Sequence, residues 1–138
     1  MNLSLLRLVK RRAQYRCEYC RIPWGTSLTP FQIDHVIARK HGGSSAASNL
    51  AFCCLHCNLN KGPNIAGIDP NTGRMISLFH PRRDRWREHF LLRVDGHILG
   101  RTDMGRVTVR VLDMNAFDAV ALRGCLIAEG RMKFEVPQ

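Results

Sequence analysis

The sequence contains few acidic residues and no long apolar segment. Only 11 Asp and Glu stand against 21 Lys and Arg, which gives a formal charge of +10 over 138 residues. No apolar run reaches the roughly 18 residues that a transmembrane helix needs, and no repeat, low-complexity tract or interdomain linker occurs. These absences argue against membrane-spanning, fibrous and disordered proteins. With 45% hydrophobic residues, an ordinary globular value, the chain is expected to form one compact domain.

The excess of basic residues predicts a polyanionic partner. Arginine accounts for 17 of the 21 basic residues, and its guanidinium pairs with phosphate through two parallel hydrogen bonds, which favours nucleic acid. The charge is uneven, with a net +7 in residues 1–61 and +3 in residues 62–138. A basic protein without such a partner is the alternative that charge alone leaves open.

The first twelve residues do not resemble a secretory signal. Their charges follow the apolar residues, and Arg7 interrupts the apolar stretch, whereas a signal peptide places its charges first. We therefore expect a cytoplasmic protein, with a bacterial or phage source, that has no contact with membranes. Thiols stay reduced in that compartment, so paired cysteines are expected to bind metal rather than to form disulfides.

Two Cys-x-x-Cys pairs predict a structural zinc site. A two-residue gap lets both thiolates of a turn point at one ion, and two such turns supply the four sulfurs of a tetrahedral site. The predicted ligands are Cys17, Cys20, Cys54 and Cys57. A redox-active dithiol is the alternative. The remaining two cysteines, Cys53 and Cys125, are expected in the core.

Local patterns predict a mixed α+β fold. In the first part we expect a helix at 3–14, strands at 31–37 and 50–53, and a helix from 54 to about 60. In the second part we expect a turn at 71–73, a short helix from Pro81 to Phe90, a hairpin around 95–96, and a helix at 116–129 capped by Asn115. The pattern at 103–112 fits either a helix or a strand.

The order of motifs in residues 11–63 resembles the zinc-containing branch of the HNH endonuclease family. In sequence, the motifs are Cys-x-x-Cys, Asp-His-Val-Ile, Gly-Gly, Asn-Leu and Cys-x-x-Cys-Asn-x-x-Lys-Gly. Residues 67–86 show a weaker likeness to the tail of some bacterial members. The resemblance implies a ββα-metal (His-Me finger) unit at 1–63, clamped by a four-cysteine zinc site. A small α+β extension at 64–138 would pack on this unit within one compact domain.

The resemblance also implies roles for single residues. Asp34 would bind a catalytic divalent cation, His35 would act as general base, and Asn49 would tether the loop and fix His35. Asn58 stands where the family usually places a second histidine ligand, so the motif here reads His-Asn-Asn. An amide oxygen suits Mg²⁺ or Mn²⁺ better than Ni²⁺ or Zn²⁺. We expect phosphate contacts from three flanking cations, Arg39, Lys40 and Lys61.

Chemistry supports this interpretation independently of the resemblance, because a neutral histidine is the natural base near pH 7 and a cation can neutralise phosphate charge. Asp34 and His35 are neighbours on a predicted strand, where side chains alternate between faces. A strand end or a bulge must therefore let both reach one site.

The resulting hypothesis is a metal-dependent endonuclease that hydrolyses DNA to 5′-phosphate and 3′-hydroxyl ends, with no small-molecule cofactor. The alternative is a non-catalytic, zinc-stabilised module that binds nucleic acid. That alternative explains the charge and the cysteines, but it gives no reason for the order of Asp34, His35, Asn49 and Asn58.

Overall fold

The computed structural model describes residues 2–134. The chain divides into two compact units. The first, the N-terminal unit, comprises the chain up to Ile65 together with His80–Asp84, and the second, the C-terminal unit, comprises Ala66–Phe79 and the chain from Arg85 onward. None of the helices within residues 2–134 combines the length and the apolar character that crossing a membrane would require.

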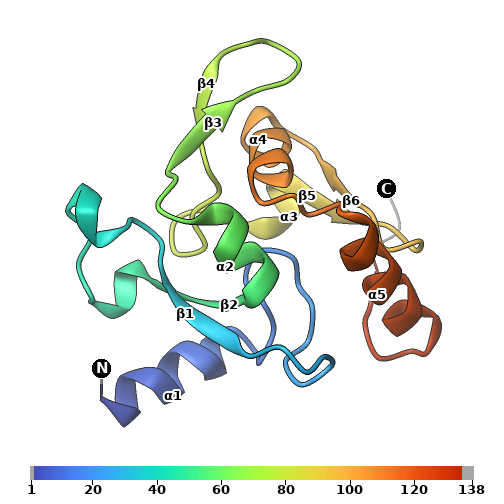
Figure 1. The fold of residues 1–138 in the computed structure, drawn as a ribbon, viewed down its shortest axis with the longest axis horizontal. Coiled ribbons are helices and arrows are strands. Elements are labelled where there is room, and N and C mark those ends of the chain that lie inside the picture. Colours follow the sequence, from blue (N-terminus) through green and yellow to red (C-terminus); the bar gives the residue numbers. More distant parts are fainter. Residues whose placement is uncertain (1, 135–138) are drawn as a thin grey trace. The chain divides into compact units, whose positions relative to one another are not determined.

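The N-terminal unit is built around two antiparallel strands and the helix that follows them (Figure 1). Strand β1 (Phe31–His35) pairs with β2 (Leu50–Cys54), and α2 (Leu55–Lys61) begins at the next residue. The 3₁₀ turns η1 (Arg39–His41) and η2 (Ala47–Asn49) lie in the connection between the strands. Pairing is regular, with Asp34 opposite Ala51 and His35 opposite Leu50.

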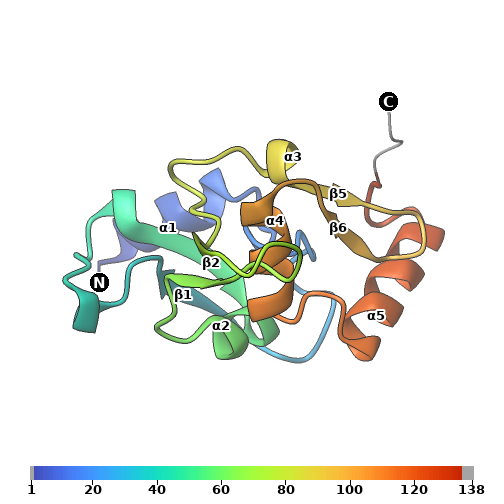
Figure 2. The same cartoon turned by 90° about the horizontal axis from the view of Figure 1, so that it is seen from above.

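Helix α1 (Leu3–Arg12) supplies the other half of this core. The Asn2 side chain accepts a hydrogen bond from the Leu5 amide (2.8 Å) and so caps the helix. Val9 and Ala13 pack with Leu50 and Phe52 of β2, and all four are buried. Figure 2 shows α1 and the β1–β2 pair from a second direction.

The C-terminal unit contains two short hairpins and three helices. Its strands are β3 (Ala66–Ile68) paired with β4 (Met75–Ser77), and β5 (Phe90–Leu92) paired with β6 (Ile98–Gly100). Its helices are α3 (Trp86–His89), α4 (Asp103–Val111) and α5 (Phe117–Ala128). Buried Asp69 receives two hydrogen bonds from Arg106 of α4, both at 3.0 Å, which ties the first hairpin to that helix.

The structure confirms the predicted mixed α+β class and the elements of the N-terminal unit. Three predictions for the chain after position 79 are wrong. The helix expected from Pro81 begins only at Trp86, because the His80 carbonyl accepts from the amides of Arg83 and Asp84 and forms a turn. Cys125 is exposed rather than in the core, since α5 buries Arg123, Leu126 and Ile127 instead.

Asn115 does not cap α5, as the sequence had indicated. The residue at the cap position is Ala116, and no side chain caps the helix there. The Asn115 amide instead accepts from the Ile98 N–H (2.8 Å) and donates to the Ile98 carbonyl (2.9 Å). Asn115 therefore extends the ladder of β6 with its side chain.

This geometry distinguishes a bridging asparagine from a capping one. Asn115→Ala should lower the free energy of unfolding by about 1–3 kcal/mol, because two backbone groups lose their partner. Asn115→Ser should be as destabilising as Asn115→Ala, although serine is a good cap. Urea denaturation of the full chain measures both effects. Full recovery of stability with serine would contradict the bridging role.

Candidate functional site

A buried cluster of four cysteine thiols joins two distant parts of the N-terminal unit. The ligand atoms of Cys17, Cys20, Cys54 and Cys57 all lie within 4.8 Å of one another. In each pair the amide of the second cysteine donates to the sulfur of the first, at 3.5 Å for Cys20 and 3.4 Å for Cys57. The arrangement fits one tetrahedral ion with four sulfur ligands, which zinc prefers in structural sites.

The pKa values of the cysteine thiols are also consistent with a bound cation. Burial raises the pKa of Cys17, but hydrogen bonds from the surrounding thiols outweigh burial and hold that pKa well below its ordinary value. Hydrogen bonding to Cys17 raises the pKa values of Cys20 and Cys57 well above theirs. The protonated neighbours therefore stabilise one thiolate at Cys17, and a bound metal ion would replace their protons.

Cys53 does not belong to this cluster. It is fully buried, and its thiol donates to the Cys54 carbonyl (3.3 Å). The prediction that Cys53 is a core residue is confirmed.

Asp34, His35 and Asn58 meet at a cavity of about 260 Å³. Asp34 and His35 end β1, whereas Asn58 follows Cys57 on α2. The strand pairing is regular through His35, so the strand end, and not a bulge, lets both neighbours reach one cavity. The other lining residues are Ile33, Ala38, Arg39, Gly62 and Pro63.

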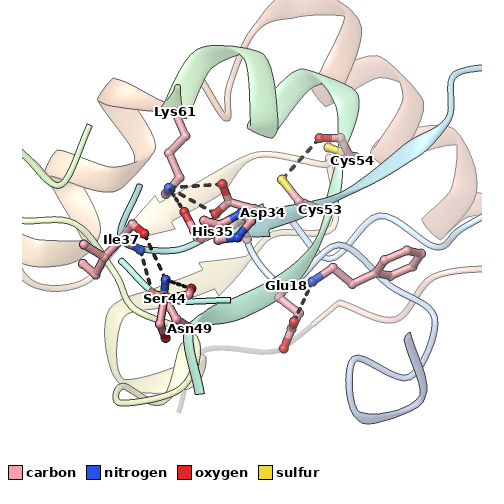
Figure 3. A network of polar contacts seen from close by, with 11 residues as sticks. Glu18, Asp34, His35, Ile37, Ser44, Asn49, Cys53, Cys54 and Lys61 are labelled. Carbon is pink, nitrogen blue, oxygen red and sulfur yellow. Dashed lines mark hydrogen bonds and ion pairs between the residues drawn. The ribbon is translucent and has the colours of Figure 1, made fainter. Parts of the chain in front are cut away.

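Asp34 is buried and already has two donors. The Tyr19 hydroxyl donates to its Oδ2 (2.7 Å), and the Lys61 ammonium lies 3.1 Å from Oδ2 and 3.3 Å from Oδ1. Burial raises the pKa of Asp34, while Lys61 and Tyr19 oppose that rise. Lys61 also donates to the carbonyl of His35 (3.3 Å), as Figure 3 shows. One buried cation thus ties both residues at the strand end to α2.

Asn49 holds the loop that follows the strand. Its Oδ1 accepts from the Ile37 amide (2.8 Å), and its Nδ2 donates to the carbonyls of Ile37 (2.9 Å) and Ser44 (2.7 Å). Figure 3 shows the amide between these two segments. A side chain at Gly43 would place its Cβ 1.7 Å from the Ile37 oxygen, so only glycine fits this close approach.

The held loop also positions His35. His35 Nε2 lies 3.0 Å from the Ser45 hydroxyl, and Ser45 directly follows the residue that Asn49 binds. When Nε2 carries the proton and the hydroxyl accepts it, Nδ1 has the free lone pair. The imidazole is half-buried, so its free nitrogen can be reached from the cavity.

The three predicted phosphate-binding cations occupy different environments. Arg39 is exposed and lines the cavity. Lys40 is exposed in the same 3₁₀ turn but does not line it. The Lys61 side chain is only 1% exposed and is bound to Asp34. The sequence reasoning missed the Tyr19–Asp34–Lys61 contact and the Ser45–His35 contact, for which spacing gives no signal.

The oxygen donors of the cavity are of the type that hard divalent cations prefer. One carboxylate and one amide oxygen, completed by water and a substrate phosphate, make a typical magnesium environment. Because Lys61 already compensates the charge of Asp34, a cation at this position must share the carboxylate with an ammonium group.

Two strands followed by a helix, with the cysteine cluster at their junction, define a ββα-metal fold. Residues 17–64, about a third of the chain, match the family model described as HNH endonuclease, and this segment is similar to an HNH domain. No curated protein and no solved structure gives a significant match to the chain.

The cysteine cluster predicts about one tightly bound zinc per chain. Cys57→Ser should reduce the zinc content toward zero and destabilise the N-terminal unit, because zinc binding contributes to folding. Cys125→Ser is the matched control and should retain the zinc, since Cys125 is exposed and outside the cluster. Elemental analysis and thermal unfolding provide the readouts. Full zinc content in the Cys57 variant would refute the ligand assignment.

Proposed function

We propose that the HNH segment is a metal-dependent endonuclease that hydrolyses phosphodiester bonds of DNA. The observation that carries the proposal is the cavity in which a histidine, a carboxylate and an amide meet. A histidine base and oxygen ligands for a divalent cation are what phosphodiester hydrolysis by water requires. The match to the HNH endonuclease family supports the same class of activity.

His35 is the proposed general base. Its contact with Ser45 fixes the orientation of the ring and leaves one nitrogen for a water molecule. Asn49 is the proposed positioning residue, because it holds the loop that carries Ser45. A proton from the attacking water passes to the imidazole as the water oxygen bonds to phosphorus and the 3′ oxygen leaves.

Asp34 and Asn58 are the proposed ligands of the divalent cation, Mg²⁺ or Mn²⁺ by preference, with Ni²⁺ or Zn²⁺ as alternatives. When bound, such a cation supplies charge neutralisation at the phosphate and stabilisation of the leaving oxygen. Lys61 of α2 and Tyr19 of the first cysteine pair both bind the Asp34 carboxylate, and Asp34 lines the same cavity as Asn58.

DNA is the proposed substrate because the charge of the N-terminal unit is unbalanced. Its sequence contains eleven Lys and Arg against three Asp and Glu. Arg39, which is exposed and lines the cavity, is the proposed contact to a phosphate next to the scissile bond. A non-catalytic zinc module would share this charge, but it would not need a histidine beside a buried carboxylate.

His35→Ala should lower the rate of plasmid nicking by about 10²- to 10⁴-fold, the range that general bases contribute. Zinc content and the unfolding transition should stay unchanged, because the imidazole is half-buried and outside the cysteine cluster. His97→Ala, at an exposed hairpin position of the C-terminal unit, is the control. Equal cleavage by wild type and the His35 variant, in Mg²⁺, Mn²⁺ and Ni²⁺, would favour the non-catalytic alternative.

Asn58 allows a test of the cation site that does not depend on the base. Asn58→Ala should raise the Mg²⁺ concentration needed for half-maximal cleavage by about ten- to a hundredfold, comparable to the loss of a residue that supports a metal ligand. Asn58→His should restore activity in Ni²⁺ more than in Mg²⁺, because imidazole suits the softer ion.

Asn60→Ala is the matched control for this series. It lies on the same helix, and its side chain donates to the His56 carbonyl (2.8 Å) and does not line the cavity. Unchanged metal dependence in both Asn58 variants would exclude Asn58 as a ligand.

A further inference from the structure

A second, larger cavity lies on the N-terminal unit, and neither the proposed base nor the proposed cation ligands line it. Its volume is about 460 Å³. The wall consists of the loop after β1 and the segment that rejoins this unit at His80–Asp84. The lining residues are Ile37, Gly42, Gly43, Ser44, Ser48, Asn49, His80, Arg82 and Arg83.

Every charged side chain that lines this cavity is cationic. Arg83 is exposed, and Arg82 is half-buried beside it. The nearest carboxylates do not line the cavity: Glu18 is paired with Arg82, and Asp84 accepts from the His80 amide (2.9 Å). Ser44 and Ser48 add exposed hydroxyl groups to the opposite loop.

Arg82 has hydrogen-bonding capacity that its own partner does not use. One nitrogen of its guanidinium binds Glu18, whose other oxygen accepts from the Phe52 amide (2.8 Å). The second terminal nitrogen, Nη1, is buried and has no partner among the described residues. Burial and the nearby Arg12 lower the pKa of Arg82 to about 10, so it remains charged at neutral pH. A buried donor without a partner costs free energy, and a small rotation of the guanidinium toward the cavity would let an acceptor satisfy it.

The hydrogen bonding of His80 determines which of its ring nitrogens is the donor. Its Nδ1 accepts a hydrogen bond from the Arg82 amide (3.2 Å), so in the neutral ring the proton is on Nε2. Burial first, and then the charge of Arg83, lowers the pKa of His80. The ring is therefore neutral at physiological pH and donates through Nε2.

Neighbouring residues of one loop line the two cavities. Ile37 lines the larger cavity and the next residue, Ala38, lines the smaller one that contains His35. Ser44 lines the larger cavity, and Ser45 binds the His35 ring. The Asn49 side chain donates to the carbonyls of Ile37 and Ser44 and so holds the two ends of this loop together.

We propose that the larger cavity binds a backbone phosphate of the DNA strand next to the scissile phosphate, through His80, Arg82 and Arg83. Two guanidinium groups and one N–H donor match the oxygens of a phosphodiester. The proposal rests on the proposed function for the identity of the strand, but the binding step itself requires no cleavage.

The test measures DNA affinity in the cleavage-deficient His35→Ala background at several salt concentrations. Adding Arg83→Gln should weaken binding on the order of tenfold and should reduce the log–log salt slope by about 0.9, the value for one phosphate contact. Arg74→Gln removes the same charge from an exposed position of the C-terminal unit and is the matched control. Equal effects of the Arg83 and Arg74 substitutions would overturn the proposal.

Neutral methylphosphonate linkages identify the phosphate that is bound. One internal linkage close to the cleavage position should weaken binding when neutralised, and this penalty should disappear with Arg83→Gln. A penalty that persists in the variant, or that occurs only at a terminal phosphate, would contradict the site. Arg82→Lys gives a second variant, because it keeps a cation for Glu18 and loses the unpaired nitrogen. Urea denaturation monitors its fold, and its binding should weaken in the same direction.

Failure of the proposed function gives a different result. The wild-type chain could cleave no DNA in Mg²⁺, Mn²⁺ or Ni²⁺, while the neutral linkage still weakens DNA binding by the wild type and not by Arg83→Gln. That result would refute the nuclease assignment and support the phosphate site. If the wild type cleaves DNA and Arg83→Gln binds DNA as tightly as its parent, the phosphate site is refuted and the nuclease assignment stands.

Discussion

The convergence of four cysteine sulfurs is the constraint on which the N-terminal unit depends. One pair of sulfurs comes from a loop after α1, and the other from the junction of β2 and α2. Bringing them together fixes the direction in which α2 leaves the sheet, and this direction places Asn58 beside the end of β1. Glu18, within the first pair, adds two hydrogen bonds to Phe52 of β2. A sulfur-bound ion at this point would hold a small core and an active-site geometry at once.

Two buried polar contacts then complete the site within this framework. Lys61 neutralises Asp34 and binds the carbonyl of His35, so the helix holds the last two residues of the strand. Asn49 binds both sides of the loop that follows. Removing one partner from such a buried contact leaves an unsatisfied group, which costs more than the contact contributes. The side chains that are proposed to react are therefore supported by buried, hydrogen-bonded groups.

The sequence predicted the cysteine cluster and the ββα order because both depend on short-range spacing. Two-residue gaps orient thiols, and β-branched runs favour strands, so these features need no knowledge of tertiary contacts. The hairpin at 66–77 was missed because strands of three residues show no clear alternation. The role of Asn115 was misassigned because a local cap and a long-range bridge to Ile98 use the same side chain. The burial of Lys61 was not predictable, since it depends on a carboxylate 27 positions earlier.

A titration of the zinc-loaded chain with Mn²⁺, followed by paramagnetic broadening of its amide signals, tests the location of the cation site most directly. The account predicts that broadening centres on residues 34–39 and 58–62, the segments that line the smaller cavity, and that Asp34→Asn abolishes it. Broadening centred on the carboxylates of the C-terminal unit, with these two segments unaffected, would contradict the central claim that one cavity of the N-terminal unit holds both the base and the divalent cation.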